Sequence, residues 1–214
     1  MSWQLTYNNL LRIAGWRNAP TITPVSTYYP RYFKMSVSIV VANSSHALYA
    51  EIICDLMYIS AQERGTGIAR RSPEYISRKM KEGKAVIALE EGVAVGFAYI
   101  ETWSHCRFVA NSGLIVAHSH RNTGLARKIK EKVFALSRDL YPDSKIFSIT
   151  TGLAVMKINY ELGFRPVTFS ELTDDPDFWR GCEGCRNYDI LLRNNHRMCL
   201  CTGLLYDPSY KTIR

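Results

Sequence analysis

The chain has 214 residues, of which 47% are hydrophobic, and it carries a formal net charge of +8. This length allows one sizeable core, and no apolar run reaches the roughly 18–20 residues that a membrane-spanning helix needs. The basic residues Arg12, Arg17, Arg31 and Lys34 precede the first acid, Glu51, and without them the positive excess falls to +4. So mild a charge fits an anionic small ligand rather than a nucleic acid duplex. We therefore expect neither a nucleic acid nor a membrane as partner.

Residues 1–34 differ from the rest of the chain. They contain prolines and tyrosines without clear periodicity, so we expect them to be poorly ordered. An acid-free start with arginines is typical of a transit peptide, but no amphipathic helix is evident, which favours an extension upstream of a start at Met35. No secretory signal is visible either, so a cytoplasmic location with reduced cysteines is expected.

From Met35 onward, the sequence predicts alternating strands and helices. Residues 36–41 are expected to form a strand and residues 47–62 a helix with apolar side chains at helical spacing. Ser72 and Pro73 mark the start of a second helix that ends near Gly83. Two further strands form a hairpin, and another strand follows them; these are residues 85–89, 94–102 and 108–116.

The second half continues this pattern with a helix at 124–140, a strand at 146–150 and a short helix at 154–162 that ends at Gly163. A less regular tail follows, in which residues 188–192 are expected to form a strand. This order predicts one α/β domain over residues 35–177. A short cysteine-rich extension over residues 178–214 is expected to pack on that domain.

The turn before the helix at 124–140 has the features of a phosphate site. Gly124 allows the backbone to approach a ligand closely, and the helix N-terminus directs unpaired N–H groups and partial positive charge outward. Arg127, Lys128 and Lys130 add cations nearby. The alternative is an ordinary strand-to-helix turn with solvated basic residues.

This turn resembles the signature of the GNAT superfamily of coenzyme A-dependent N-acyltransferases: Arg or Gln, two residues, Gly, one residue, then Gly or Ala. Arg121, Gly124 and Ala126 occupy those positions, and Leu162-Gly163-Phe164 matches the family's Leu-Gly-Phe. The resemblance implies an α/β fold with a mixed, mostly antiparallel sheet flanked by helices, and acetyl-CoA or another acyl-CoA as co-substrate. The coenzyme A-binding residues that it implies are Leu114, Ile115, Val116, Arg121, Asn122, Thr123, Gly124, Leu125, Ala126, Arg127 and Asn159.

Residues 64–71, 148–164 and 178–191 are more narrowly similar to a bacterial GNAT branch linked with arginine biosynthesis. For that branch the implied reaction is transfer of an acetyl or succinyl group to the amine of glutamate. GNAT folds place their acceptor-binding loop at the position of residues 64–71, so Arg64, Arg70 and Arg71 are candidates to hold the carboxylates of a small amine acceptor. A solvated basic loop is the alternative. A homodimer is compatible with this resemblance.

Acyl transfer needs a base for the acceptor's ammonium, and an acid or thiolate stabilisation for the leaving sulfur. Glu101, near a strand end, is the candidate base, and a surface carboxylate is the alternative. Where the family's common acid is a tyrosine, this chain has Asn159, which can donate a hydrogen bond to coenzyme A but no proton; Tyr160 is the fallback acid. The resemblance also implies that Leu114–Val116 splays from the strand at 146–150, binds pantetheine and polarises the thioester through a backbone N–H.

Four of the six cysteines lie close together near the C-terminus. Cysteine pairs with short spacers are typical of a tetrahedral zinc site. Cys182, Cys185, Cys199 and Cys201 are therefore candidate ligands of a structural zinc, with His196 as a substitute. Four reduced thiols in a small subdomain are the alternative.

These observations together predict a GNAT-type N-acyltransferase. Two other functions stay open. One is a non-catalytic module that binds acyl-CoA as a regulator, because the usual tyrosine is missing. The other is a zinc-dependent interaction module centred on the cysteines. Release of coenzyme A in the presence of an amine acceptor separates the enzyme from both alternatives.

Overall fold

A computed structural model describes residues 36–64 and 70–210 of the chain. Two sequence predictions fall outside the described residues: the poorly ordered segment 1–34, and residues 65–69 of the expected acceptor loop together with the side chain of Arg64. Among the residues that are described, no helix is both long and apolar enough to cross a membrane.

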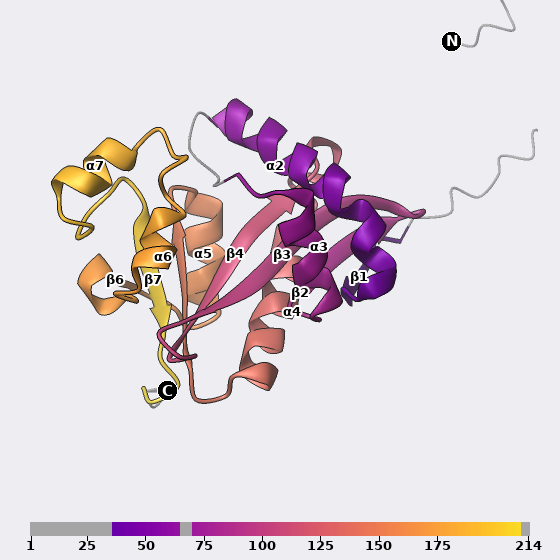
Figure 1. Cartoon of the computed structure of the whole chain (residues 1–214). Helices are drawn as coiled ribbons and strands as arrows, with labels where there is room; N and C mark the ends of the chain where they lie inside the picture. The colour runs from indigo at the N-terminus through magenta and orange to yellow at the C-terminus, as the bar shows by residue number, and fades with distance from the viewer. Residues whose placement is uncertain (1–35, 65–69, 211–214) are drawn as a thin grey trace, which may run out of the picture. The chain divides into compact units, whose positions relative to one another are not determined.

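A seven-stranded sheet runs through the described chain (Figure 1). Neighbouring strands pair antiparallel except β4 and β5, which pair in parallel. The expected mixed, mostly antiparallel α/β architecture is therefore confirmed. In spatial order, the strands are β1 (Ser38–Val41), β2 (Ala85–Glu90), β3 (Val93–Trp103), β4 (Phe108–Val116), β5 (Lys145–Thr150), β7 (Thr202–Tyr206) and β6 (Arg165–Val167).

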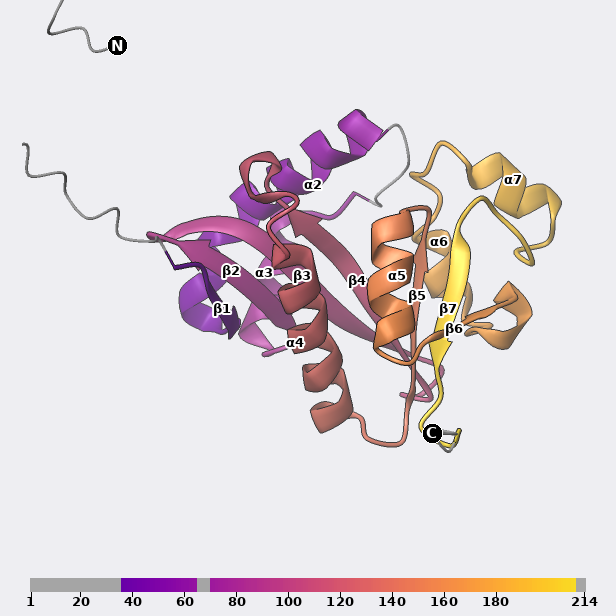
Figure 2. The same ribbon diagram turned by 180° about the vertical axis from the view of Figure 1, so that it is seen from behind.

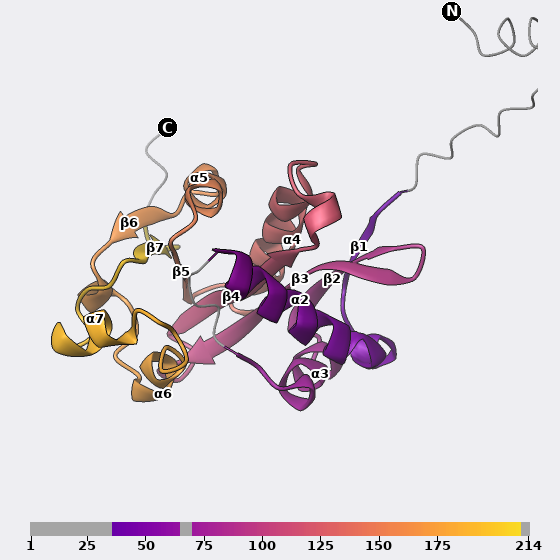
Figure 3. The ribbon, with the colours of Figure 1, turned by 90° about the horizontal axis from the view of Figure 1, so that it is seen from above.

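Helices cover both faces of the sheet. The 3-10 helix η1 (Ser44–Tyr49), α2 (Ala50–Arg64) and α3 (Pro73–Lys81) lie on one face. On the other face lie α4 (Leu125–Leu140) and α5 (Leu153–Glu161), as the views from behind and from above show (Figures 2 and 3). The short helices α6 (Pro176–Arg180) and α7 (Tyr188–Arg193) lie beside β5 and β7, and two single turns complete the chain, η2 (His118–His120) and η3 (Phe169–Glu171).

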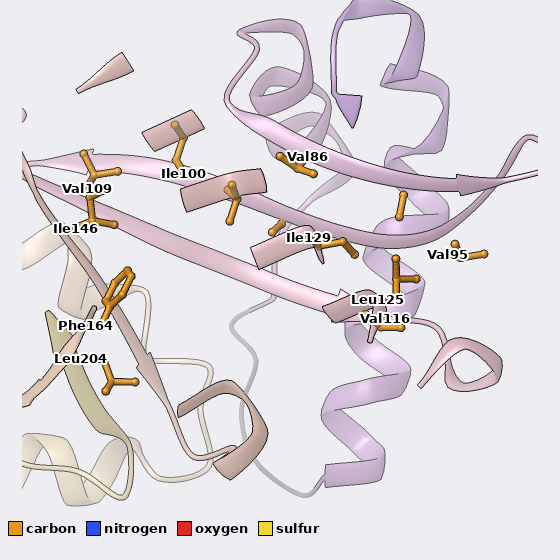
Figure 4. Packing of buried hydrophobic residues seen from close by; sticks show 13 residues of the cluster. Val86, Val95, Ile100, Val109, Val116, Leu125, Ile129, Ile146, Phe164 and Leu204 are labelled. Carbon is orange, nitrogen blue, oxygen red and sulfur yellow. The ribbon is translucent and has the colours of Figure 1, made fainter. Parts of the chain in front are cut away.

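Alternate residues of the central strands face two separate cores, as the pleat of a strand requires. On β2, Val86 and Ala88 belong to the core under α4, whereas Ala85 and Ile87 belong to the core under α2 and α3. Ile129 of α4 is fully buried in the first of these cores (Figure 4). Each fully buried side chain of this size contributes roughly 1.5–3 kcal/mol, so the two cores fix both faces of the sheet.

The sequence signals at the helix ends are largely confirmed. The side chain of Ser72 accepts a hydrogen bond from the N–H of Tyr75, and Pro73 opens α3, as predicted. At the end of α5, Gly163 has φ of +90°, the left-handed conformation that glycine adopts without steric cost. These two boundaries matter for function because α3 and α5 stand on opposite faces of the β4–β5 junction.

The strand predicted at residues 188–192 is wrong, because residues 188–193 form helix α7. In a strand, Tyr188, Ile190 and Leu192 would share one face. Instead, Tyr188 and Leu191, which are three residues apart, pack in the same core and Leu192 is 54% exposed, so burial follows helical spacing. The side-chain amide of Asn194 donates to the carbonyl of Ile190 at 2.7 Å and holds the last turn.

The final strand of the sheet, β7, was not predicted from the sequence. It pairs with β5 from Thr202 to Tyr206 and with β6 on its other edge, so it is inserted between two elements that precede it in the chain. Between β5 and β7 along the chain, Trp179 and Leu191 pack on Phe147 in a third core. The C-terminal segment thus forms the edge of the sheet next to β5 and the core that covers it.

Lys130 of α4 is 1% exposed, which is unusual for a lysine. Its ammonium donates to the side-chain oxygen of Asn111 at 3.0 Å, and Asn111 donates in turn to Ser137 at 2.8 Å. No ion pair to Lys130 is found within residues 36–64 and 70–210. Burial lowers the pKa of Lys130 to about 7.

Lys130→Met is expected to stabilise the protein at pH 6 by about 1–2 kcal/mol, because it removes an unpaired buried charge at the cost of one hydrogen bond. The unfolded chain binds this proton up to about pH 10, but the folded chain releases it near pH 7. Stability of the wild type therefore rises with pH across this window, and the gain from the substitution shrinks. Urea unfolding at pH 6 and pH 9.5 measures this, with the exposed Lys128→Met as control; destabilisation at both pH values would contradict it.

Candidate active site

Strands β4 and β5 separate along their length and open a cavity between them. Their parallel pairing covers only Phe108–Ala110 and Lys145–Phe147. Beyond it, Asn111–Leu114 and Ser148–Thr151 line the same cavity from the two strands. The splay that the GNAT resemblance implies is therefore present, and it begins at Ala110.

A bulge in β4 lies within this opening. The register of β4 against β3 shifts between Phe97 and Tyr99, and Gly113 has φ of +65°. A Cβ atom at Gly113 would lie 2.4 Å from the Tyr99 ring, so only glycine fits there. A bulge removes one residue from the hydrogen-bond ladder, which leaves backbone groups of β4 available beside the cavity.

The cavity has a volume of ≈ 530 Å³, within the range of about 300–1,000 Å³ that small-molecule sites occupy. Three parts of the chain line it. They are the segment that leads into α3, the strands β3, β4 and β5, and the C-terminal segment around α6 and α7. Its polar and ionisable lining includes Arg70, Arg71, Ser72, Tyr75, Tyr99, Glu101, Asn111, Ser112, Ser148, Thr150, Thr151, Asp177, Cys182, Cys185, Asn187, Tyr188, Cys199 and Cys201.

Glu101, the predicted base, lines this cavity from β3. The hydroxyl of Tyr75 donates to its Oε1, and the ammonium of Lys79 lies 3.5 Å from the same oxygen. The Glu101 side chain is only 11% exposed. Burial raises its pKa, and the charge of Arg71 partly opposes that rise. A carboxylate with a raised pKa in a cavity is typical of a general base, since it can accept a proton near neutral pH.

Arg71 is the charged group of the expected acceptor loop that the structure brings beside Glu101. Its Nε donates to the hydroxyl of Tyr99 at 2.9 Å, and its guanidinium stacks 5.3 Å from the centre of the Tyr75 ring. Arg70 also lines the cavity, and its guanidinium lies over Tyr58. Two of the three predicted acceptor arginines therefore border the cavity.

The predicted phosphate turn lies outside the cavity, at the N-terminus of α4. Gly124 is the residue before the helix, with φ of +82°, and no side chain caps this helix end. The N–H groups of the first turn therefore point outward without intrahelical partners. Asn122 also has positive φ, and the Thr123 hydroxyl donates to the carbonyl of His120 at 2.7 Å, which shapes the turn.

The two arginines of this turn are engaged with other elements. Arg121 donates to Ser60 at 3.0 Å and pairs with Glu63 at 2.6 Å, so it ties the turn to α2. Arg127 pairs with Glu161 of α5. Both side chains hold the turn in place, whereas its backbone N–H groups face outward. Leu125 is buried under the turn and Ala126 is half-buried.

Of the other predicted coenzyme A contacts, Leu114 lines the cavity, whereas Ile115 and Val116 are buried in the cores on opposite faces of the sheet. Asn159 is fully buried, and both atoms of its side-chain amide lack a hydrogen-bond partner among the described residues. An unpaired buried amide costs roughly 1–3 kcal/mol, and Asn159 does not line the cavity. Tyr160, the fallback acid, is 71% exposed and does not line the cavity.

The four late cysteines all line the cavity. The Cys185 sulfur accepts from the N–H of Asn187 at 3.5 Å, and the Cys199 thiol donates to the carbonyl of the same residue at 3.8 Å. Burial raises the pKa of Cys182 to about 11 and of Cys201 to about 12, so both are thiols at neutral pH. Within the described part of the chain, no group of three or more His, Cys, Asp or Glu side chains is arranged to hold a metal ion. The zinc prediction thus gains no support.

Sequence reasoning missed Tyr75, Lys79 and Tyr99, which surround Glu101 and Arg71. Tyr75 and Lys79 are four residues apart on α3, so they share one helix face. That spacing was visible in the sequence, but no sequence signal predicted that this face of α3 packs against the end of β3. Tyr99 is two residues before Glu101 and therefore on the same face of β3.

No protein-family model and no curated protein matches this sequence. Among solved structures, the fold is similar to N-acetylglutamate synthase from Neisseria gonorrhoeae in complex with coenzyme A and N-acetyl-glutamate, at 20% identity and a TM-score of 0.58, covering 80% of this chain and 35% of that one. The chain thus spans about a third of the length of that enzyme. It is also similar to diaminobutyrate acetyltransferase from Paenibacillus lautus in complex with its substrate and coenzyme A, at 13% identity and a TM-score of 0.54, covering 84% and 99% of the two chains.

A third similar structure is an acetyltransferase of the GNAT family from Staphylococcus aureus, at 17% identity and a TM-score of 0.52, covering 65% of this chain and 91% of that one. At these identities the likeness concerns the fold. With its parted β4 and β5 and its uncapped helix after β4, the chain has the fold of the GNAT acetyltransferases.

Proposed function

We propose that this chain transfers an acyl group from coenzyme A to the amine of a small acceptor. The single observation that carries the proposal is the cavity at the parting of β4 and β5, which contains Glu101 with a raised pKa. The uncapped N-terminus of α4, at Gly124, offers a site for the pyrophosphate of coenzyme A. The pantetheine arm would run from there along β4 toward Leu114.

In this proposal, Glu101 removes a proton from the acceptor's ammonium, and the neutral amine attacks the thioester carbonyl. The C–N bond forms first and gives a tetrahedral oxyanion, and the C–S bond breaks when this intermediate collapses. The second proton lost by nitrogen neutralises the departing thiolate. The bulge at Gly113 supplies a backbone N–H that can stabilise the oxyanion of the intermediate. The amide of Asn159 would bind the coenzyme A arm by hydrogen bonds.

The finer proposal is that the acceptor is a carboxylate-bearing amine such as glutamate, and that the acyl group is acetyl. Arg70 and Arg71 border the same cavity as Glu101, and guanidinium groups bind carboxylates with two parallel hydrogen bonds. The similar enzyme from Neisseria gonorrhoeae was solved with N-acetyl-glutamate, which is consistent with this acceptor. Succinyl as the acyl group is the alternative.

Thiol release with acetyl-CoA and succinyl-CoA, screened against single amino acids, tests the proposed function. The expected result is release that depends on both substrates and is fastest with an acidic amino acid. If calorimetry detects binding of coenzyme A but no acceptor causes thiol release, the regulatory module is favoured. The exposed position of Tyr160, the fallback acid, also supports that alternative. Absence of binding would refute the proposal.

Arg71→Ala is expected to raise the acceptor KM about tenfold while leaving the KM for acyl-CoA nearly unchanged, because one charge-assisted hydrogen bond is worth roughly 1.5–3 kcal/mol. Steady-state kinetics with each substrate varied in turn measures the two constants. Arg193→Ala is the matched control, since its side chain is exposed on α7 and does not line the cavity. Equal changes in both KM values would argue for a general structural role of Arg71.

A further inference from the structure

One face of α3 is directed at the Glu101 carboxylate. Tyr75 and Lys79 are separated by one helical turn, and both reach the same carboxylate oxygen, Oε1. The Lys79 ammonium also lies 5.2 Å from the centre of the Tyr75 ring, so the three side chains form one compact group. No hydrogen bond to the second oxygen, Oε2, is found within residues 36–64 and 70–210.

This arrangement is built into the interior of the protein rather than formed by chance on its surface. The side chains of Lys79 and Glu101 are each only 11% exposed. At such burial an ion pair is screened far less than on the surface, and loss of one partner leaves an uncompensated charge. Glu101 and Tyr75 line the cavity and Lys79 does not, so Lys79 acts on the cavity through these two side chains.

We propose that Lys79 and Tyr75 are positioning residues that occupy Oε1 of Glu101, keep the carboxylate ionised, and leave Oε2 free to accept the proton of the acceptor's ammonium. This inference rests on the proposed function, since it assigns the support of the base in that reaction. It adds Lys79 of α3, which does not line the cavity, to the residues that support Glu101.

Charged groups on α3 and on the segment before it surround the carboxylate. Arg71, which precedes α3, faces Glu101 and opposes the rise of its pKa. Lys79 itself has a pKa of about 8, lowered by burial, with Glu82 acting in the opposite sense and Lys84, Arg78 and Arg71 adding to the lowering. Lys79 is therefore protonated below about pH 8.

Both contacts favour the charged form of Glu101. A cation within about 4–6 Å lowers the pKa of a carboxyl group by about one unit or more, and a donated hydrogen bond acts in the same direction. Burial raises the pKa of Glu101 and by itself favours the protonated form. Tyr75 and Lys79 offset this cost of burial, and the carboxylate keeps a pKa suited to proton transfer.

Lys79→Met is expected to move the acidic limb of the kcat/KM profile upward by about one pH unit, because the Glu101 carboxyl is then harder to ionise. The plateau above that limb should fall much less. Lys79→Arg restores the charge and is expected to return the limb to within a few tenths of a unit. Lys81→Met removes an identical charge from the exposed side of α3 and is expected to leave the profile unchanged.

A second measurement does not depend on activity. Carbon-13 NMR of labelled glutamate side chains, with the Glu101 signal assigned by its loss in Glu101→Gln, gives the pKa of the carboxyl directly. The expected result is an upward shift in Lys79→Met and a smaller one in Tyr75→Phe. An unchanged Glu101 pKa in both variants, with the folds intact, overturns the inference even if the chain proves to be an acyltransferase. If no acceptor releases thiol, the proposed function fails and the titration still decides the role of Lys79.

Discussion

Glu101→Gln is expected to lower kcat/KM by about 100-fold or more, because a positioned general base contributes roughly 10²–10⁴-fold to such reactions. The substitution keeps the size of the side chain and can still accept the hydrogen bond from Tyr75. It removes the ability to take a proton from the acceptor's ammonium, together with the negative charge that faces Lys79. The KM for acyl-CoA should change little, since the carboxylate faces the acceptor end of the cavity beside Arg71.

The remaining activity of this variant should depend on pH in a different way. Without the base, the fraction of acceptor that is already neutral limits the rate, so activity should rise steadily toward alkaline pH. Glu131→Gln, an exposed position on α4, is the control for the loss of one carboxylate. A variant that retains more than half of the wild-type rate across the pH range would remove Glu101 from the reaction.

Much of the fold was predictable because the signals were local. The apolar spacing of α4, the cap at Ser72 and the glycine at position 163 each lie within one element or at its edge. The failure at 188–192 has a different origin. Tyr188, Ile190 and Leu192 alternate as in a strand. The side chain that is buried is Leu191, because it packs in the same tertiary core as Phe147 and Trp179.

The candidate site divides in the same way. Glu101, Arg70 and Arg71 were predicted from the resemblance and do line one cavity. Lys79 was not predicted, because its importance arises only when α3 packs its inner face against the end of β3. The cysteines were read as a metal site from their spacing. The structure places all four in the cavity wall, and among the described residues it shows no group arranged to hold a metal ion, so the zinc site stays a prediction without support.

Gly124→Glu is expected to weaken binding of coenzyme A by about 100-fold, since it places a negative charge at a helix N-terminus where a phosphate would bind, and each tenfold loss corresponds to about 1.4 kcal/mol. A Cβ atom at Gly124 would meet nothing within 4 Å, so the new side chain has open space and the core is not disturbed. Isothermal titration calorimetry with coenzyme A measures the change.

The positive φ of Gly124 calls for a control that separates backbone strain from charge. Any side chain at φ of +82° carries some strain, but asparagine tolerates the left-handed conformation better than other residues. Gly124→Asn should therefore bind coenzyme A within a few-fold of the wild type, and thermal unfolding should show both variants folded. Dephospho-coenzyme A keeps the pyrophosphate, so Gly124→Glu should weaken its binding by the same factor as the binding of coenzyme A. If Gly124→Glu binds coenzyme A as tightly as Gly124→Asn does, the pyrophosphate does not lie at the N-terminus of α4.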